Sequence, residues 1–259
     1  MRGDCADPAI FHEKHLSGVY FDTIIHFAGQ SSGEISFDDP VQDLSDNCVS
    51  TLNLLQFARE VLCERFILAS SMSVYGDVQA DLVSETHTTN PISMYAVGKL
   101  ASEHYLRIYQ RYGIKSVSLR LFNVYGPGQN MSKLRQGMVS IYLAQARREG
   151  NIVVKGSADR FRDFVYIDDV TEVVDKFIDH GLAGFEIYNV CTGVKTKVSE
   201  LLGCISQALG PNSTSIRYID GTPGDQFGIV GDNSKLINAL GKTEFFDIET
   251  GIDKFLSSL

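Results

Sequence analysis

Short apolar segments and amphipathic helical segments alternate along the first half of this 259-residue chain. Residues 20–29, YFDTIIHFAG, predict a buried strand that ends at a glycine, and residues 49–62, VSTLNLLQFAREVL, have apolar residues at helical spacing. RFILASS at 65–71 predicts a second strand, residues 92–112 a long helix, and KSVSLRLFN at 115–123 a third strand. This alternation is typical of a parallel α/β sheet.

The second half of the chain continues the pattern and then changes. Helices are predicted at 138–149 and 168–180, and strands at 151–156, 164–167 and 185–190. After about residue 192 the elements become shorter and the turns denser, while no repeat, low-complexity tract or linker interrupts the chain. We therefore expect any second domain to be interwoven with the first.

Composition narrows the functional classes. A net charge of -9 and a pI of about 5.1 argue against a nucleic-acid or membrane-surface binder, whereas anionic small molecules remain possible ligands. The five cysteines are scattered and lack a CxxC spacing, so neither a disulfide framework nor a metal site is expected. The first residues lack an apolar signal core, and no apolar run approaches the roughly 18 residues of a membrane span. We predict a cytoplasmic protein with reduced thiols.

Small and hydroxylated residues follow the three predicted strands, at residues 26–29, 70–76 and 122–127. In open parallel sheets ligands bind beyond the carboxyl ends of the strands, so these segments are where a ligand is expected. Small residues let a flat ligand approach the backbone, and hydroxyl or amide groups orient it. For any one segment the alternative remains open that small residues simply end a strand.

Tyr95 and Lys99 are four residues apart near the start of the predicted long helix. Residues i and i+4 lie one above the other on a helix, so the phenol and the ammonium can both contact one bound molecule. A single pair of this kind also occurs by chance, and the interpretation therefore depends on the surrounding motifs.

Several segments in order resemble the extended short-chain dehydrogenase/reductase family, specifically its NAD-dependent nucleotide-sugar epimerases and dehydratases. They are HFAG (26–29), NCVSTLNLL (47–55), SSMSVYG (70–76), YAVGK (95–99), RLFNVYGPGQ (120–129), RDFVYIDDV (162–170), YNVCTG (188–193) and PGD (223–225). The resemblance implies a Rossmann-like, doubly wound parallel sheet, with residues 1–128 and 164–191 binding the dinucleotide. It implies that a small interwoven α+β domain, residues 129–163 and 192–259, binds the nucleotide sugar.

The resemblance also implies the catalytic residues. Tyr95 is the expected acid/base at a sugar hydroxyl, Lys99 holds the nicotinamide ribose and favours the phenolate, and Ser71 hydrogen-bonds the reacting oxygen. A free tyrosine titrates at about pH 10, so a nearby cation is needed for it to act as a base at neutral pH. For Ser71 alone, the alternative is a satisfied hydroxyl at the end of a strand.

The resemblance assigns further residues to ligands. The implied cofactor is NAD, and the residues expected to bind it are Asp4, Cys5, Phe27, Ala28, Gly29, Asn47, Ser70, Tyr95, Lys99, Phe122 and Val124. The residues expected to bind the nucleotide sugar are Ser71, Asn123, Arg162, Arg217 and Asp225. Arginine suits a diphosphate because its planar fork donates to two oxygens at once. The alternative for Arg162 is a surface ion pair with Asp159 or Asp163.

The reaction within the family is predicted from the residues before Val74. Dehydratases and related decarboxylases place a glutamate, and the former often an aspartate before it, where this chain has Ser73 and Met72. Neither side chain is a carboxylic acid, so elimination lacks its expected proton donor and base. We therefore predict 4-epimerisation of a nucleotide-linked hexose, with a UDP-hexose favoured. A dehydratase or reductase of the same family, or a non-catalytic nucleotide-sugar-binding fragment, remains an alternative.

Three departures from the family pattern qualify these expectations. The sequence begins at the Gly-Asp turn and contains no G-x-x-G-x-x-G motif, so we expect the first two strands of the sheet to be missing, with poor NAD binding and poor folding. Thr222 replaces a common phosphate-binding arginine, and Ser31 replaces a lysine that contacts the cofactor. A homodimer is also expected, because the helices at about 45–62 and 92–112 pair across a two-fold axis in the family.

Overall fold

The computed structural model describes residues 3–12, 18–210, 214–221 and 227–259. The chain divides into two compact units, here called the first and the second unit. The first comprises Met1–Gly76, Thr88–Arg120 and Val174–Tyr188, and the second comprises Asp77–His87, Leu121–Val173 and Asn189–Leu259. The ligand-based domain division at residues 128, 163 and 191 stays a prediction.

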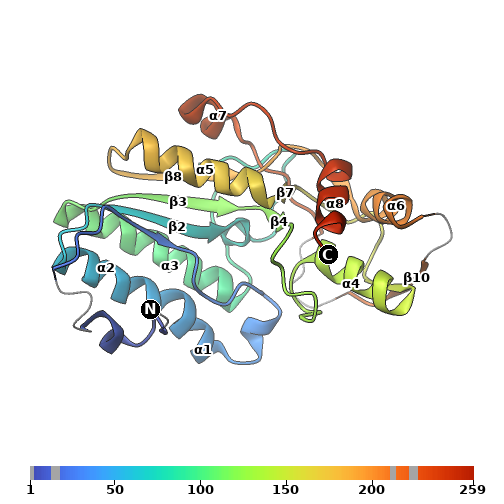
Figure 1. Ribbon diagram of the computed structural model, residues 1–259, viewed down its shortest axis with the longest axis horizontal. Helices are drawn as coiled ribbons and strands as arrows, with labels where there is room; N and C mark the ends of the chain where they lie inside the picture. The colour runs from blue at the N-terminus through green and yellow to red at the C-terminus, as the bar shows by residue number, and fades with distance from the viewer. Residues whose placement is uncertain (1–2, 13–17, 211–213, 222–226) are drawn as a thin grey trace. The chain divides into compact units, whose positions relative to one another are not determined.

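A four-stranded parallel sheet forms the centre of the first unit (Figure 1), with the strand order β1-β2-β3-β8. Its strands are β1 (Thr23–His26), β2 (Arg65–Ser71), β3 (Lys115–Leu121) and β8 (Phe185–Val190). β1 pairs with β2 in register from Thr23 with Arg65 to His26 with Leu68. The fold class predicted from the alternating pattern is confirmed. Among the described strands β1 is an edge strand, and the side chain of Ile25 on it is 45% exposed.

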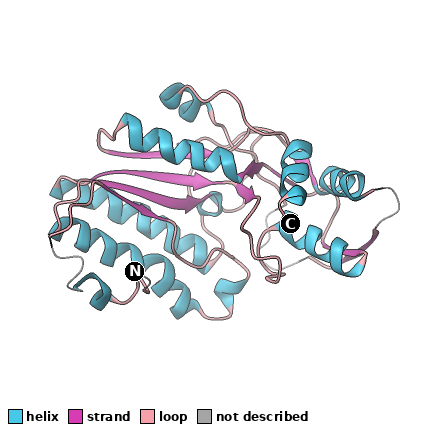
Figure 2. Ribbon diagram, in the orientation of Figure 1, coloured by secondary structure: helices cyan, strands magenta, loops and turns pink. Residues whose placement is uncertain are grey.

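Helices cover both faces of this sheet (Figures 1 and 2). α1 (Pro40–Leu44) continues through a π-helical turn (Ser45–Val49) into α2 (Ser50–Glu60), and α3 (Met94–Tyr109) runs beside them. α5 (Ile167–His180) lies on the opposite face, where Phe177 packs on Tyr188 with ring centroids 5.0 Å apart. The core between α2, α3 and the sheet consists of Leu55, Ala58, Cys63, Phe66, Leu68, Leu106 and Ile114.

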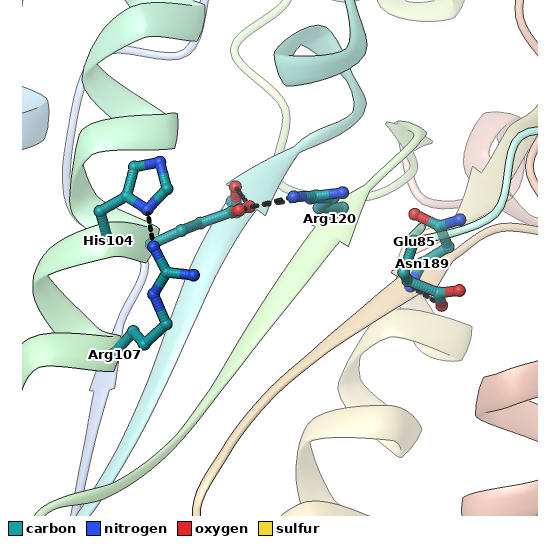
Figure 3. Close-up of polar contacts among 7 residues, drawn as sticks. Glu85, His104, Arg107, Arg120 and Asn189 are labelled. Atoms are coloured by element: carbon teal, nitrogen blue, oxygen red, sulfur yellow. Dashed lines mark hydrogen bonds and ion pairs between the residues drawn. The ribbon is translucent and has the colours of Figure 1, made fainter. Parts of the chain in front are cut away.

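A buried ion pair ties β3 to α3. The Arg120 guanidinium donates from Nε to Glu103 Oε1 at 3.0 Å and from Nη2 to Oε2 at 2.7 Å, and Figure 3 shows Arg120 in this contact. Ser70 Oγ donates to the same carboxylate at 2.6 Å, and Arg120 stacks 4.7 Å from the ring centroid of Tyr75. Burial opposes the charge of Arg120, but the hydrogen bonds and charge of Glu103 raise its pKa above its ordinary value.

The described residues of the second unit form three two-stranded sheets and an apolar core. β4 (Asn123–Tyr125) pairs with β7 (Phe164–Tyr166) and β5 (Asn151–Lys155) with β10 (Ser215–Ile219), both in parallel, while β6 (Phe161–Arg162) and β9 (Thr196–Lys197) are antiparallel. Its helices are α4 (Met138–Glu149), α6 (Val198–Leu209), α7 (Ser234–Leu240) and α8 (Ile248–Ser257). α4, α6 and α8 enclose a core that includes Leu143, Leu201 and Phe255.

The buried carboxylate of Asp163 organises the loops of the second unit. It accepts hydrogen bonds from the Thr192 backbone at 2.8 Å, the Thr192 hydroxyl at 2.7 Å, the Gly193 backbone at 2.9 Å and the Gly231 backbone at 3.3 Å. Burial raises the pKa of Asp163 to about 6, and these donors oppose the rise. Asp163 therefore links the connection between β6 and β7 to two distant loops.

Figure 2 shows how short the helices are. Within the described ranges, each of them falls short of the length and apolarity that crossing a bilayer requires.

Candidate active site

Helix α3 places Tyr95 and Lys99 on one face, as the i, i+4 spacing predicts. The helix starts at its N-cap Ser93, whose hydroxyl accepts from the Ala96 backbone at 3.2 Å. Tyr95 and Lys99 are 7% and 5% exposed, and the Lys99 Nζ lies 5.7 Å from the centroid of the Tyr95 ring. A phenol and an ammonium are therefore buried together in the first two turns.

Ser71 lies at the end of β2 and faces the same tyrosine. Its hydroxyl caps the short 3-10 helix Met72–Tyr75 by accepting from the Ser73 backbone at 3.1 Å. Burial raises the pKa of Tyr95 to about 12, the hydrogen bond with Ser71 lowers it, and the charge of Asp43 raises it further. The structure thus brings Ser71, Tyr95 and Lys99 together in the first unit.

Lys99 is the cationic member of this cluster. Burial lowers the pKa of Lys99 to about 8, and the nearby Asp43 carboxylate acts in the opposite direction. The Lys99 side chain is buried, and the three donors of a buried ammonium require acceptors. A hydroxyl-rich ligand is the kind of molecule that supplies them.

Gly29, shortly after the end of β1, packs closely against the side chain of Asn47. Gly29 has φ +139°, and a Cβ on it would lie 2.6 Å from Asn47 Oδ1, so only glycine fits. Asn47 lies in the π-helical turn, a feature frequent at functional sites. Its Oδ1 is buried without a hydrogen-bond partner in the described part of the chain. This orphan acceptor and Lys99 offer complementary contacts to a hydroxyl group.

His26 is a buried histidine at the end of β1. Its Nε2 is 3.1 Å from Thr51 Oγ1, while Nδ1 has no hydrogen-bond partner among the residues described. Burial lowers the pKa of His26 to about 4, and the positive charge of Lys99 lowers it further. His26 is therefore neutral at physiological pH and adds no second cation beside Lys99.

The other cofactor candidates of the first unit have varied surroundings. Asp4 is exposed and caps a turn, accepting from the Ala6 backbone at 2.9 Å, and the Cys5 carbonyl accepts from Asn53 Nδ2 at 3.1 Å. Phe27 is 45% exposed, and Ala28 is exposed beside it. Ser70 is buried with its hydroxyl donating to Glu103, which gives it a role in the scaffold.

The remaining candidates belong to the second unit. Phe122 is buried, and Asn123 and Val124, the first two residues of β4, are half-buried. Arg217 is exposed on β10. Asn123 Nδ2 donates to the Asp163 carbonyl at 3.1 Å. Asp225 and the departure at Thr222 lie outside the described residues.

Arg162 is buried, in contrast to the surface ion pair considered as its alternative. It is 4% exposed and donates from Nη1 to the carbonyls of Phe161 at 2.8 Å and Phe227 at 3.2 Å. The two acids of that alternative are engaged elsewhere, since Asp163 binds loop amides and Asp159 lies 3.1 Å from Lys197 Nζ. Burial and the neighbouring Arg160 lower the pKa of Arg162 to about 10. Two like charges held inside a protein favour an anionic ligand.

Sequence reasoning missed Asp43. This aspartate is 2% exposed in α1, and Gln30 Nε2 and Asn47 Nδ2 donate to its Oδ1 at 2.7 Å and 3.2 Å. The available signal was its i, i+4 spacing to Asn47, which places both side chains on one helical face. Among the described residues no group of three or more histidines, cysteines and acids is arranged to hold a metal.

Comparison with known proteins shows the family of this chain. Residues 1–191 match the model of the NAD dependent epimerase/dehydratase family. The chain belongs to this family. The prediction from the sequence motifs is therefore confirmed, and NAD is the cofactor of the family.

Individual relatives carry different activities. A UDP-glucose 4-epimerase of Mycolicibacterium smegmatis is 36% identical over 193 residues, which are 73% of this chain and 60% of that protein. A GDP-6-deoxy-D-mannose reductase of Pseudomonas aeruginosa is 36% identical over 189 residues, 70% of this chain and 61% of that protein. A UDP-glucose 4-epimerase of Thermotoga maritima, solved with UDP-glucose, superposes with a TM-score of 0.92 at 28% identity, covering 100% of this chain and 83% of that one. The first two matches thus span about three fifths of each relative's length.

The described residues fit a nicotinamide ribose. Lys99 is a buried donor, and Asn47 Oδ1 is a buried acceptor without a hydrogen-bond partner among these residues, which together suit a diol. The glycine at position 29 lets the Asn47 side chain lie directly against the backbone there.

Proposed function

We propose that this chain epimerises C4 of a nucleotide-linked hexose with NAD as cofactor. The observation that carries the proposal is the buried cluster of Tyr95, Lys99 and Ser71, in which the phenol contacts a serine hydroxyl and lies beside an ammonium. These are the groups needed to move a proton at a sugar hydroxyl while hydride leaves and returns. The relatives include both a 4-epimerase and a related reductase, so the choice of epimerisation is part of this proposal.

In the proposed reaction NAD supplies a reversible hydride acceptor. Tyr95 takes the proton of the sugar hydroxyl as it is oxidised and returns it when the keto group is reduced from its other face. Ser71 orients the reacting oxygen through its hydroxyl. Lys99 donates hydrogen bonds to the ribose, and its charge stabilises the Tyr95 phenolate against the desolvation that raises the pKa of the phenol.

The absence of carboxylates at Met72 and Ser73 favours epimerisation over elimination. Ser73 contacts Ser71 Oγ with its own hydroxyl at 3.1 Å, so the position next to the reacting serine has neither an acid nor a base of useful strength. A reductase remains the second candidate, because the reductase from Pseudomonas aeruginosa is as similar to this chain as the epimerase from Mycolicibacterium smegmatis, at 36% identity each.

We propose that UDP-hexose is the substrate class and that Arg162 binds its diphosphate, with Asn123, Arg217 and Asp225 as further substrate residues. The burial of Arg162 beside Arg160 supports this role, because an anion stabilises two neighbouring guanidinium groups. NAD is proposed to contact Asp4, Cys5, Phe27, Ala28, Gly29, Asn47, Ser70, Phe122 and Val124 in addition to the catalytic pair.

We also propose a cytoplasmic homodimer. Along α1 and α3 the side chains of Val41, Leu44, Val97 and Ile108 are 77%, 49%, 51% and 48% exposed. Such apolar stripes are unfavourable in water and are typical of an interface between copies. Sedimentation equilibrium tests this state, and a monomer mass at all concentrations refutes it.

The test of the activity begins with the purified protein as isolated. Denaturation is expected to release NAD, and incubation with NAD and UDP-glucose or UDP-galactose to yield the other C4 epimer. Tyr95→Phe is expected to lower kcat by about 10²- to 10⁴-fold, because the proton acceptor is lost. Product analysis by nuclear magnetic resonance (NMR) distinguishes an epimer from a reduced or dehydrated sugar.

Tyr109→Phe is the matched control, since Tyr109 lies on the same helix and packs on Tyr112 with ring centroids 5.3 Å apart. It is expected to retain the activity of the unmodified protein. If no NAD is bound or released and no sugar is converted, the chain is a non-catalytic binding fragment instead. Conversion to a reduced product with consumption of a reduced nicotinamide would favour the reductase.

A further inference from the structure

A buried aspartate lies between α1 and α3 behind the proposed catalytic pair. Asp43 is only 2% exposed, whereas Asp46 on the following turn is half-buried. Charged side chains are rarely buried to this extent unless they are paired, because removal from water disfavours the ionised form. The position of Asp43 therefore requires a physical explanation.

The carboxylate of Asp43 is held in place through one oxygen only. Oδ1 accepts from Gln30 Nε2 at 2.7 Å and from Asn47 Nδ2 at 3.2 Å. Oδ2 is buried and has no hydrogen-bond partner within the described ranges. A Cβ on Gly98, the residue before Lys99, would lie 3.9 Å from this oxygen. The unpartnered oxygen thus lies against the turn of α3 that carries Lys99.

The charged and titratable groups that act on Asp43 come from two elements. Burial and Asp46, which lies in the π-helical turn after α1, raise the pKa of Asp43, while the hydrogen bonds from Gln30 and Asn47 and the charge of Lys99 lower it. In return, Asp43 raises the pKa values of Lys99 and Tyr95. On β1, His26 interacts with Lys99 and stays neutral at physiological pH. Asp43 is therefore the acidic group that opposes the effect of burial on the pKa of Lys99.

We propose that Asp43 is a positioning residue of the active site, which keeps the buried Lys99 ammonium charged through its unpartnered oxygen and so maintains the cation beside Tyr95. The catalytic part of this proposal rests on the proposed function, whereas the coupling of Asp43 to Lys99 does not. A neutral Lys99 would still donate hydrogen bonds, but it would no longer stabilise a phenolate. The carboxylate acts through Lys99 and needs no contact with the sugar.

The first experiment measures Lys99 in the free protein. Lysine labelled with ¹³C at Cε is titrated by NMR, and Lys99→Arg identifies the resonance of Lys99. The midpoint of the unmodified protein is expected at about 8. Asp43→Asn, which keeps the size of the side chain and removes its charge, is expected to move the midpoint to lower pH. Asp46→Asn removes the same charge from a half-buried site on the same helical segment and is expected to leave the midpoint nearly unchanged, because Asp43 and not Asp46 acts on Lys99.

A second measurement keeps the proposal testable if Asp43→Asn does not fold. Coupling between two sites is reciprocal, so Lys99→Met must raise the titration midpoint of Asp43, followed with ¹³C-labelled aspartate. Asp43→Glu retains the charge and is expected to restore most of the Lys99 midpoint. If neither Asp43→Asn nor Lys99→Met shifts the midpoint of the other residue, Asp43 is only a structural residue and the proposal is wrong.

The pH profile of turnover tests the catalytic part. In Asp43→Asn the alkaline limb of kcat is expected at lower pH than in the unmodified protein and in Asp46→Asn, because Lys99 loses its proton earlier. A purely structural role would lower activity without moving this limb, which would overturn the proposal. If no sugar is converted at all while the NMR shift is observed, the proposed function fails and the coupling of Asp43 to Lys99 stands.

Discussion

Helix α3 carries two buried polar clusters that are built differently. In the first, Glu103 receives two hydrogen bonds from Arg120 and one from Ser70. In the second, Lys99 is buried beside the Tyr95 ring, and Asp43 Oδ2 and Asn47 Oδ1 are buried acceptors without hydrogen-bond partners among the described residues. The first cluster is complete within the protein, and the second is complete only when a further molecule supplies hydroxyl groups.

The difference separates a structural role from a functional one. A satisfied ion pair connects α3 to β3 and gains nothing from a ligand. An unsatisfied group of donors and acceptors lowers the stability of the free protein, and a ligand that pairs with these groups recovers that stability. Substitutions in the two clusters should therefore change stability in opposite directions.

The largest effect is expected from breaking the satisfied cluster. Arg120→Met leaves the Glu103 carboxylate buried without its guanidinium partner and is expected to lower the free energy of unfolding by about 3–5 kcal/mol. Urea unfolding monitored by circular dichroism measures this change. Combining Arg120→Met with Glu103→Leu removes both charges and should recover most of the loss. A double variant as unstable as the single one would show that packing, and not the unpaired charge, dominates.

The same contrast shows what could be predicted from the sequence. The strands, the helices and the proximity of Tyr95 to Lys99 depend on apolar periodicity and on i, i+4 geometry, which are local properties of the chain. Asp43 was missed because its role depends on Gly98 letting α1 approach α3, and on the π-helical turn between Asp43 and α2. These are long-range packing features, which local periodicity does not encode.

Arg162 shows a similar limit. Its acidic neighbours in the sequence made a surface ion pair a reasonable alternative, since adjacent opposite charges commonly pair in solvent. Its burial follows from the antiparallel pairing of β6 with β9 and from the carbonyl of the distant Phe227. Only the tertiary contact shows that the guanidinium is enclosed.

A second prediction concerns His26 in the unsatisfied cluster. Its pKa in the folded protein, about 4, lies below the ordinary value of 6.5 that applies when the chain is unfolded. The unfolded chain thus binds a proton that the folded protein does not, and the stability from neutral His26 is present above pH 6.5 and lost as the pH falls toward 4. We expect the free energy of unfolding to fall by about 2 kcal/mol from this residue between pH 7 and pH 5.

Urea unfolding at the two pH values measures this loss. His26→Asn is expected to reduce the pH dependence, while His104→Gln, which changes an exposed histidine, serves as the control. An equal pH dependence in all three proteins would contradict the burial of a neutral His26.

The smallest expected effect has the opposite sign. Lys99→Met removes a buried ammonium whose pKa burial lowers to about 8, and the flexible apolar side chain can occupy the same space. Measured without NAD at pH 7 and combined with Asp43→Asn, so that no carboxylate is left buried without its cation, Lys99→Met is expected to raise the free energy of unfolding by about 1 kcal/mol, because both desolvated charges are gone. Lys115→Met is the control, since this lysine on β3 has a side chain that is 48% exposed and its substitution should change stability by about 0.5 kcal/mol or less. A loss of stability in this double variant comparable to that in Arg120→Met would mean that Lys99 is part of the scaffold, and the distinction between the two clusters would fail.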